Sequence, residues 1–100
     1  MGKKEVIYLA IFEPDPDVYK RDRGRNYSGP YGVYFPDVLG CASYGEDFAE
    51  AKEMAHEALQ LHLDWMVRDG DEIPESTLRV SEEDLEDGCI AVGIKVLLPL

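Results

Sequence analysis

The residues best suited to chemistry in this chain are two histidines and two cysteines, and their spacing keeps them apart. His56 and His62 fall in one predicted helix but differ by about 600° of rotation, so they do not share a face that would hold a metal ion or an acid–base pair. Cys41 and Cys89 form no CxxC pair, and no histidine stands at zinc-ligand spacing from either. A nucleophilic Cys41 would also need a neighbouring base, which the sequence does not supply. We expect reduced structural thiols, no metal, no cofactor and no catalytic residue.

Acidic residues form the pattern with the most functional content. They recur at helical spacings of three, four and seven, and like charges at such spacings repel by roughly 0.2–0.5 kcal/mol per pair. A solvated helix face tolerates this cost, and a basic partner would relieve it, so both interpretations stay open. The candidate partner-binding residues are Glu50, Glu53, Glu57 and Asp64.

Composition limits the size of the protein and its partners. With 100 residues, the chain is predicted to form one domain over residues 1–100. Its net charge of −11 opposes binding to phosphate backbones, so direct DNA binding by this chain alone is not expected. The negative excess lies in residues 41–100, while residues 1–40 are balanced. No apolar stretch approaches the roughly 20 residues that span a membrane, and the amino terminus is not typical of a signal peptide. We expect a soluble, cytoplasmic protein with no membrane partner.

The elements that must position these side chains are four strands and one long helix. The helix is predicted over residues 48–69, because Asp47 with Glu50 forms a capping-box pattern and Gly70 is a stop signal. Residues 14–30 lack apolar periodicity and indicate an exposed loop or flexible insertion, while 81–87 are acidic and weakly helical at best. The predicted strands cover residues 6–12, 31–35, 40–44 and 89–98.

One broad apolar stripe on the predicted helix is expected to face the core. A stripe of this kind at helical spacing is typical of packing and not of a cofactor site. His56 is expected to face solvent. The stripe consists of Phe48, Ala51, Ala55, Ala58, Leu59, His62, Trp65 and Met66, widened by Met54 and Leu61.

The order β-β-β-α-β predicts an α+β fold with sheet order 3-2-1-4 and the helix on one face. A crossover through the helix predicts that strand 89–98 runs parallel to strand 6–12. Strand 6–12 is apolar on both faces, and one helix covers only one of them. We therefore expect a homodimer or larger homo-oligomer, unless loop 14–30 folds across the second face.

Residues 31–77 contain a series of short motifs in order: Phe35-Pro36-Asp37, Gly40-Cys41, Gly45-Glu46-Asp47, the 48–69 helix, Asp69-Gly70 and Ile73-Pro74-Glu75-Ser76. With these motifs, the segment resembles the HicB antitoxin family of the HicA/HicB toxin–antitoxin systems. The resemblance implies a partial RNase H-like domain that binds and neutralises a small basic HicA-type mRNA interferase by occlusion. The chain departs from the family pattern in two ways. It contains the insertion at 14–30, and, because it ends at Leu100, we expect no carboxy-terminal DNA-binding domain of the kind common in the family.

The implied fold also raises two alternatives that involve RNA. A two-metal nuclease needs converging carboxylates, normally including one in the middle of the first strand. Residues 6–12 contain none; Glu13 comes at the end, Asp15 and Asp17 follow in the loop, and only Glu53 resembles a placed ligand. We therefore expect that this chain is not an enzyme. The second alternative is a stand-alone RNA-binding or RNA-processing domain. It would use the basic residues Lys20, Arg21, Arg23 and Arg25 with exposed Tyr19, Tyr27 and Tyr31.

Overall fold

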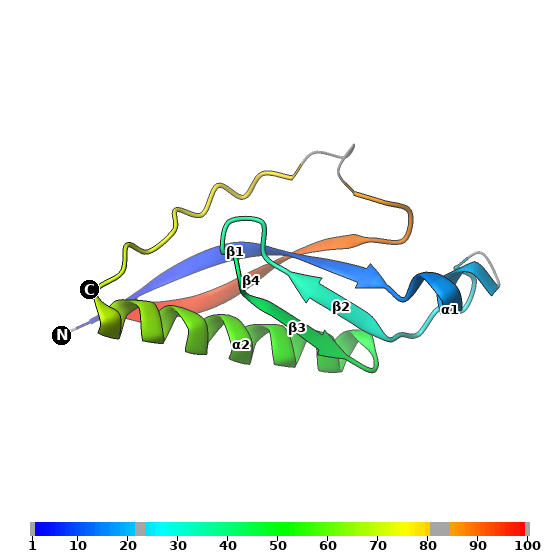
Figure 1. Ribbon diagram of the computed structural model, residues 1–100, viewed down its shortest axis with the longest axis horizontal. Helices are drawn as coiled ribbons and strands as arrows, with labels where there is room; N and C mark the ends of the chain where they lie inside the picture. The colour runs from blue at the N-terminus through cyan, green and yellow to red at the C-terminus, as the bar shows by residue number, and fades with distance from the viewer. Residues whose placement is uncertain (1, 22–23, 81–84, 100) are drawn as a thin grey trace.

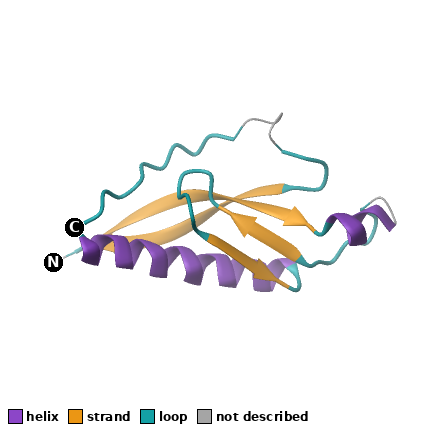
Figure 2. Ribbon diagram, in the orientation of Figure 1, coloured by secondary structure: helices purple, strands orange, loops and turns teal. Residues whose placement is uncertain are grey.

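The computed structural model describes residues 2–21, 24–80 and 85–99, which form a four-stranded sheet with one long helix against one face (Figures 1 and 2). The strand order is β3-β2-β1-β4. This confirms the predicted α+β class and sheet order. The elements are β1 (Lys3–Pro14), α1 (Pro16–Arg21), β2 (Tyr31–Tyr34), β3 (Ala42–Gly45), α2 (Phe48–Asp69) and β4 (Ile90–Pro99).

The direction of β4 differs from the prediction. β4 runs antiparallel to β1, from the pair Phe12 and Ile90 to the pair Lys3 and Pro99, so the expected parallel pairing is wrong. The reason is the path of the chain after α2: residues 71–80 run back along the length of the sheet before β4 begins (Figure 1). A right-handed parallel crossover requires the chain to enter the next strand directly from the helix.

The hydrophobic core lies between α2 and the sheet. Side chains alternate along a strand, so every second residue of β1 and β4 faces the helix. Six of these residues are buried, and α2 meets them with small and aliphatic side chains. The core residues of the two strands are Tyr8, Ala10, Phe12, Ile94, Val96 and Leu98, and those of α2 are Ala51, Ala55, Leu59 and Leu63.

A glycine allows β3 to pass close to the first turn of α2. A Cβ atom added at Gly45 would lie 2.2 Å from the backbone nitrogen of Ala51, which is closer than Cβ atoms in proteins approach a backbone atom. Gly45 and Ala51 are both buried. The small residues at this crossing therefore set how closely the helix approaches the sheet.

The buried face of α2 is narrower than the predicted stripe. Ala51, Ala55, Leu59 and Leu63 form the line of contact, whereas His62 is only half-buried at its edge. The expected burial of three large residues is wrong, because they lie to one side of this line: Met54 is 41% exposed, Leu61 53% and Trp65 54%.

Residues 14–30, expected to be an exposed loop, contain α1 and an aromatic cluster at the end of the core. The ring of Tyr27 lies 5.7 Å from Tyr19 and 5.2 Å from Tyr31, in edge-to-face contacts. The Tyr27 hydroxyl accepts a hydrogen bond from the backbone N–H of Asp15 (2.7 Å) and donates one to the carbonyl of Pro30. α1 extends beyond the end of β1, not across the sheet (Figure 1).

The sheet face opposite α2 is covered unevenly. Ile11 is buried there, but Ile7, Tyr34, Tyr44 and Leu97 are exposed. Among the helices that the structure describes, none is long and apolar enough to cross a membrane.

The extended segment after α2 is attached to β1 by side-chain hydrogen bonds. The Tyr8 hydroxyl donates to the carbonyl of Pro74 (2.6 Å), and the Ser76 hydroxyl donates to the carbonyl of Ile7. Further along, the backbone N–H of Thr77 donates to the Asp37 carboxylate (2.8 Å). Most of the predicted acidic segment 81–87 lies outside the described residues, as does Arg23 of the basic patch.

Candidate partner-binding surface

Both ends of α2 are capped by hydrogen bonds to its terminal backbone groups. At the start, the Asp47 carboxylate accepts a hydrogen bond from the backbone N–H of Glu50 (2.8 Å). At the end, Gly70 has a left-handed backbone (φ 77°). Its N–H donates to the carbonyl of Val67 and that of Asp71 donates to Met66, which is a Schellman motif. The predicted bounds of 48–69 and both predicted caps are confirmed.

The four candidate partner-binding residues all lie exposed on α2, but they are not equivalent. Glu50 belongs to the helix cap, because its carboxylate accepts a hydrogen bond from the backbone N–H of Glu46 (3.0 Å). Asp64 accepts a hydrogen bond from the side-chain amide of Gln60 (3.0 Å). Within the described chain, no hydrogen bond or ion pair of Glu53 or Glu57 is seen. These two carboxylates are therefore the ones that a partner would meet without displacing an internal contact.

Helical geometry places the acidic residues on the side of α2 that faces away from the sheet. At about 100° per residue, Glu53, Glu57 and Asp64 fall within an arc of about 40°, and the centre of this arc is about 160° from the buried line through Ala55 and Leu59. We call these three residues the acidic row. Like charges held this close raise the local negative potential, which favours a basic ligand.

Gln60 has a structural role that the sequence did not reveal. Its side-chain amide nitrogen donates to the carbonyl of Leu97 (2.7 Å), and its amide oxygen accepts from the Leu97 N–H (3.0 Å). Asp64 accepts from the same amide nitrogen and so helps to orient it. One nominated acidic residue therefore also supports the packing of α2 against β4.

The apolar residues beside the acidic row were also missed as surface residues. Met54, Leu61 and Trp65 fall within about 40° of each other around α2. Together with Val67, which is 37% exposed elsewhere on the helix, they make the described surface of α2 depart from a simple polar face. The signal in the sequence was the excessive width of the apolar stripe, which exceeds what one packed face buries.

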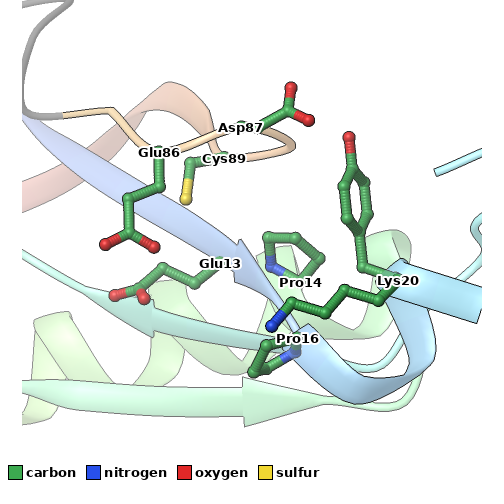
Figure 3. A pocket seen from close by; sticks show the side chains of 8 residues that line it. Glu13, Pro14, Pro16, Lys20, Glu86, Asp87 and Cys89 are labelled. Atoms are coloured by element: carbon green, nitrogen blue, oxygen red, sulfur yellow. The ribbon is translucent and has the colours of Figure 1, made fainter. Parts of the chain in front are cut away.

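A pocket at the carboxyl end of β1 contains the second cysteine (Figure 3). The cavity of about 280 Å³ is lined by Cys89, Glu13, Glu86 and Lys20, among others, and the side chains of Glu13 and Glu86 lie on the same side as the thiol in Figure 3. Burial raises the pKa of the Cys89 thiol, and the nearby Glu13 and Glu86 carboxylates raise it further. Burial also raises the pKa of the Cys41 thiol. Neither thiol is activated as a nucleophile at neutral pH.

The carboxylates considered for two-metal chemistry do not converge. Glu13 pairs across the sheet with Gly32 and follows Phe12, which faces α2, so the Glu13 side chain points to the opposite sheet face. Glu53 lies on the outer side of α2. Among the described residues, no group of three or more histidine, cysteine, aspartate or glutamate side chains is arranged to hold a metal ion.

The tyrosines proposed as an RNA-stacking set are not free for that purpose. Tyr31 is buried, contrary to the expectation that it is exposed, and its ring contacts Phe12, Tyr27 and Phe48. Tyr19 and Tyr27 are half-buried and contact each other. The aromatic residues of this region are thus used to attach the segment before β2 to the core.

The geometry is that of a small α+β domain: one capped helix lies on a four-stranded antiparallel sheet, and exposed carboxylates lie on the outer side of the helix. The chain belongs to the HicB-like antitoxin family of bacterial toxin–antitoxin systems, whose model matches residues 22–96. A curated relative, the uncharacterised 14.9 kDa protein of the rep-hol intergenic region of Haemophilus phage HP1, is 44% identical over 46 residues. That alignment covers 46% of this chain and 35% of the phage protein.

Solved structures of antitoxins and their complexes share the fold. The HicA3 and HicB3 toxin–antitoxin complex has a chain that matches with a TM-score of 0.60 at 23% identity, over 91% of this chain and 98% of that chain. A toxin–antitoxin complex from Streptococcus pneumoniae matches with 0.65 at 24% identity, over 93% and 69%. The antitoxin HicB of Burkholderia pseudomallei matches with 0.64 at 20% identity, over 89% and 61%.

Proposed function

We propose that this chain is an antitoxin that neutralises a small basic HicA-type mRNA interferase in the cytoplasm by covering its RNA-cleaving site. The proposal is supported by family membership and by the HicA3 and HicB3 complex, in which a chain of similar fold occurs together with a toxin. The observation that carries it is the acidic row, which lies exposed on the side of α2 that faces away from the sheet.

The charge of the chain fits this role. A net charge of −11 attracts a basic protein over a distance of about one Debye length and speeds its association. The same negative charge repels RNA, so the antitoxin itself would not bind the RNA that the toxin cleaves. Inhibition by occlusion needs no catalysis by the chain.

Co-expression tests the proposal. A HicA-type toxin is induced in a host strain with or without this chain, the first choice being one encoded next to the gene of this chain, and growth and mRNA integrity are followed. We expect growth to be restored and the two proteins to copurify. A toxin that remains active and does not copurify with the chain would overturn the proposal.

A control separates occlusion from lowered toxin expression. A toxin variant without cleavage activity should bind the chain equally well, and the purified chain should inhibit cleavage of a defined RNA at stoichiometric amounts. Inhibition that appears only in cells, and not with purified components, would contradict occlusion.

A further inference from the structure

A row of exposed apolar side chains, which we call the apolar row, runs along the surface of α2. Met54, Leu61 and Trp65 are 41%, 53% and 54% exposed, although tryptophan and leucine are commonly buried. Their side chains lie within about 40° of each other around the helix, and the row extends over about 16 Å along its axis. Large apolar side chains that lie exposed on one face of a helix, beside a polar border, are typical of a protein-binding site.

The acidic row borders this apolar row on one side. The two rows lie about 80° apart around the helix, so they form adjacent parts of one surface. An apolar centre with a charged rim is the usual anatomy of a specific protein interface. Because α2 is capped at both ends, the surface is held in its shape before any partner binds.

We propose that Met54, Leu61 and Trp65 form the apolar centre of the surface that docks the basic toxin, with Glu57 and Asp64 at its rim. The inference rests on the proposed function, because it takes the toxin as the occupant. Trp65 is the main anchor, since tryptophan dominates binding energy at the centre of interfaces.

Charge decides between a basic partner and a second copy of this chain. Two copies that met through this surface would bring two acidic rows together, and each chain has a net charge of −11. A basic partner gains from the same row. The exposed apolar residues of the opposite sheet face have no such bias, since the charged pair beside them, Glu5 and Lys95, is of mixed sign (3.9 Å).

The chain contains one tryptophan, so its fluorescence reports on this surface directly. The probe is the HicA-type toxin used in the co-expression test, made inactive in cleavage and with any tryptophan replaced by phenylalanine. On binding, we expect the Trp65 emission to shift to shorter wavelength and its quenching by acrylamide to fall. Trp65→Ala and Leu61→Ser should each weaken binding on the order of thirtyfold or more.

Leu39→Ser provides the matched control. Leu39 is an exposed leucine, like Leu61, but lies on the turn between β2 and β3. We expect its replacement to change the Kd less than threefold. Circular dichroism and thermal unfolding of each variant show that the fold is retained, which is expected because all three side chains are exposed.

The possible outcomes separate the two proposals. If the wild type binds the toxin, but Trp65 stays open to quenching and Trp65→Ala binds equally well, the docking surface is overturned and the antitoxin function stands. If the wild type binds no toxin, both are overturned. If Trp65→Ala converts a dimer of this chain to a monomer in sedimentation while toxin binding persists, the surface belongs to a second copy and the inference is overturned.

Discussion

The side-chain amide of Gln60 occupies both backbone hydrogen-bonding groups of Leu97 on β4. An amide side chain that donates to the carbonyl and accepts from the N–H of one residue imitates a neighbouring strand at that point. β4 pairs with β1 on one side only, so its other edge is open to unwanted pairing. Gln60 thus closes part of an edge strand and joins α2 to the sheet.

Replacing Gln60 tests this contact. Gln60→Ala should lower the free energy of unfolding by about 1 kcal/mol, because two partly solvated hydrogen bonds are lost. Gln60→Glu should be at least as destabilising at neutral pH, since a carboxylate cannot donate to the Leu97 carbonyl and would lie beside Asp64. Urea unfolding measures both. A change below about 0.3 kcal/mol for both variants would contradict the assigned role.

Reversing the acidic row should slow toxin association. The variant Glu53→Lys with Glu57→Lys leaves the cap residue Glu50 intact, and its association rate with an inactive toxin should fall about tenfold at low ionic strength and depend less on salt. Stopped-flow measurements across a salt series give both quantities. Glu72→Lys with Glu75→Lys makes the same change in net charge on the exposed segment after α2. If this control slows association equally, the effect comes from net charge and not from the acidic row.

Gly45 should tolerate no side chain. Gly45→Ala forces a Cβ against the backbone of Ala51 and should destabilise the fold by about 1–3 kcal/mol or more. Gly32→Ala, in β2, is the matched control, because a Cβ there meets no atom within 4 Å. Thermal or urea unfolding of the two variants checks the difference. Equal stability of both would show that β3 can move away from α2 without cost.

The open sheet face should support self-association. Ile7 is exposed on this face beside exposed Leu97, and monomers rarely leave such residues grouped in water. Light scattering at micromolar concentration should give a mass above that of the 11.3 kDa monomer. Ile7→Glu should yield the monomer and keep the fold, because Ile7 pairs with Lys95 across the sheet. A monomeric wild type would contradict this prediction.

The purified chain should not cleave RNA. Glu13 and Glu53 lie on opposite sides of the molecule, so they cannot hold two metal ions together. Single-stranded RNA, duplex RNA and an RNA/DNA hybrid are incubated with the chain in Mg²⁺ or Mn²⁺. Cleavage that copurifies with the chain and is lost in Glu53→Gln would show that the prediction is wrong.

Local signals predicted the helix well, whereas distant partners were out of reach. The bounds of α2 follow from Asp47 and Gly70, which act within one turn of the ends they cap. Gln60 could not be identified, because its partner Leu97 is 37 positions away and no pattern links the two residues. The prediction of the direction of β4 was wrong for a similar reason, because that direction depends on the path of the segment after α2.

The candidate site was predicted in part. Helical spacing grouped the acidic residues correctly on one face, but it could not show that Glu50 also serves the cap. Periodicity identified Trp65 as part of an apolar stripe, yet an apolar residue at helical spacing is equally consistent with burial in its own core and with contact to another protein. Only the line of contact with the sheet separates the two roles.

The pairing of β1 with β4 has a consequence for synthesis of the chain on the ribosome. Of the described elements, β1 leaves the ribosome first and β4 last, and before β4 emerges β1 gains only a short pairing from β2. Until β4 emerges, the apolar strand β1 therefore lacks its main pairing partner. Contacts between segments this far apart in the sequence form slowly, because a long loop must close. Nascent chains in this state are exposed to proteases and aggregation. Folding of β1 then depends on translation that reaches the end of β4, so synthesis interrupted before that point lowers the supply of folded protein more steeply than for a protein that folds segment by segment.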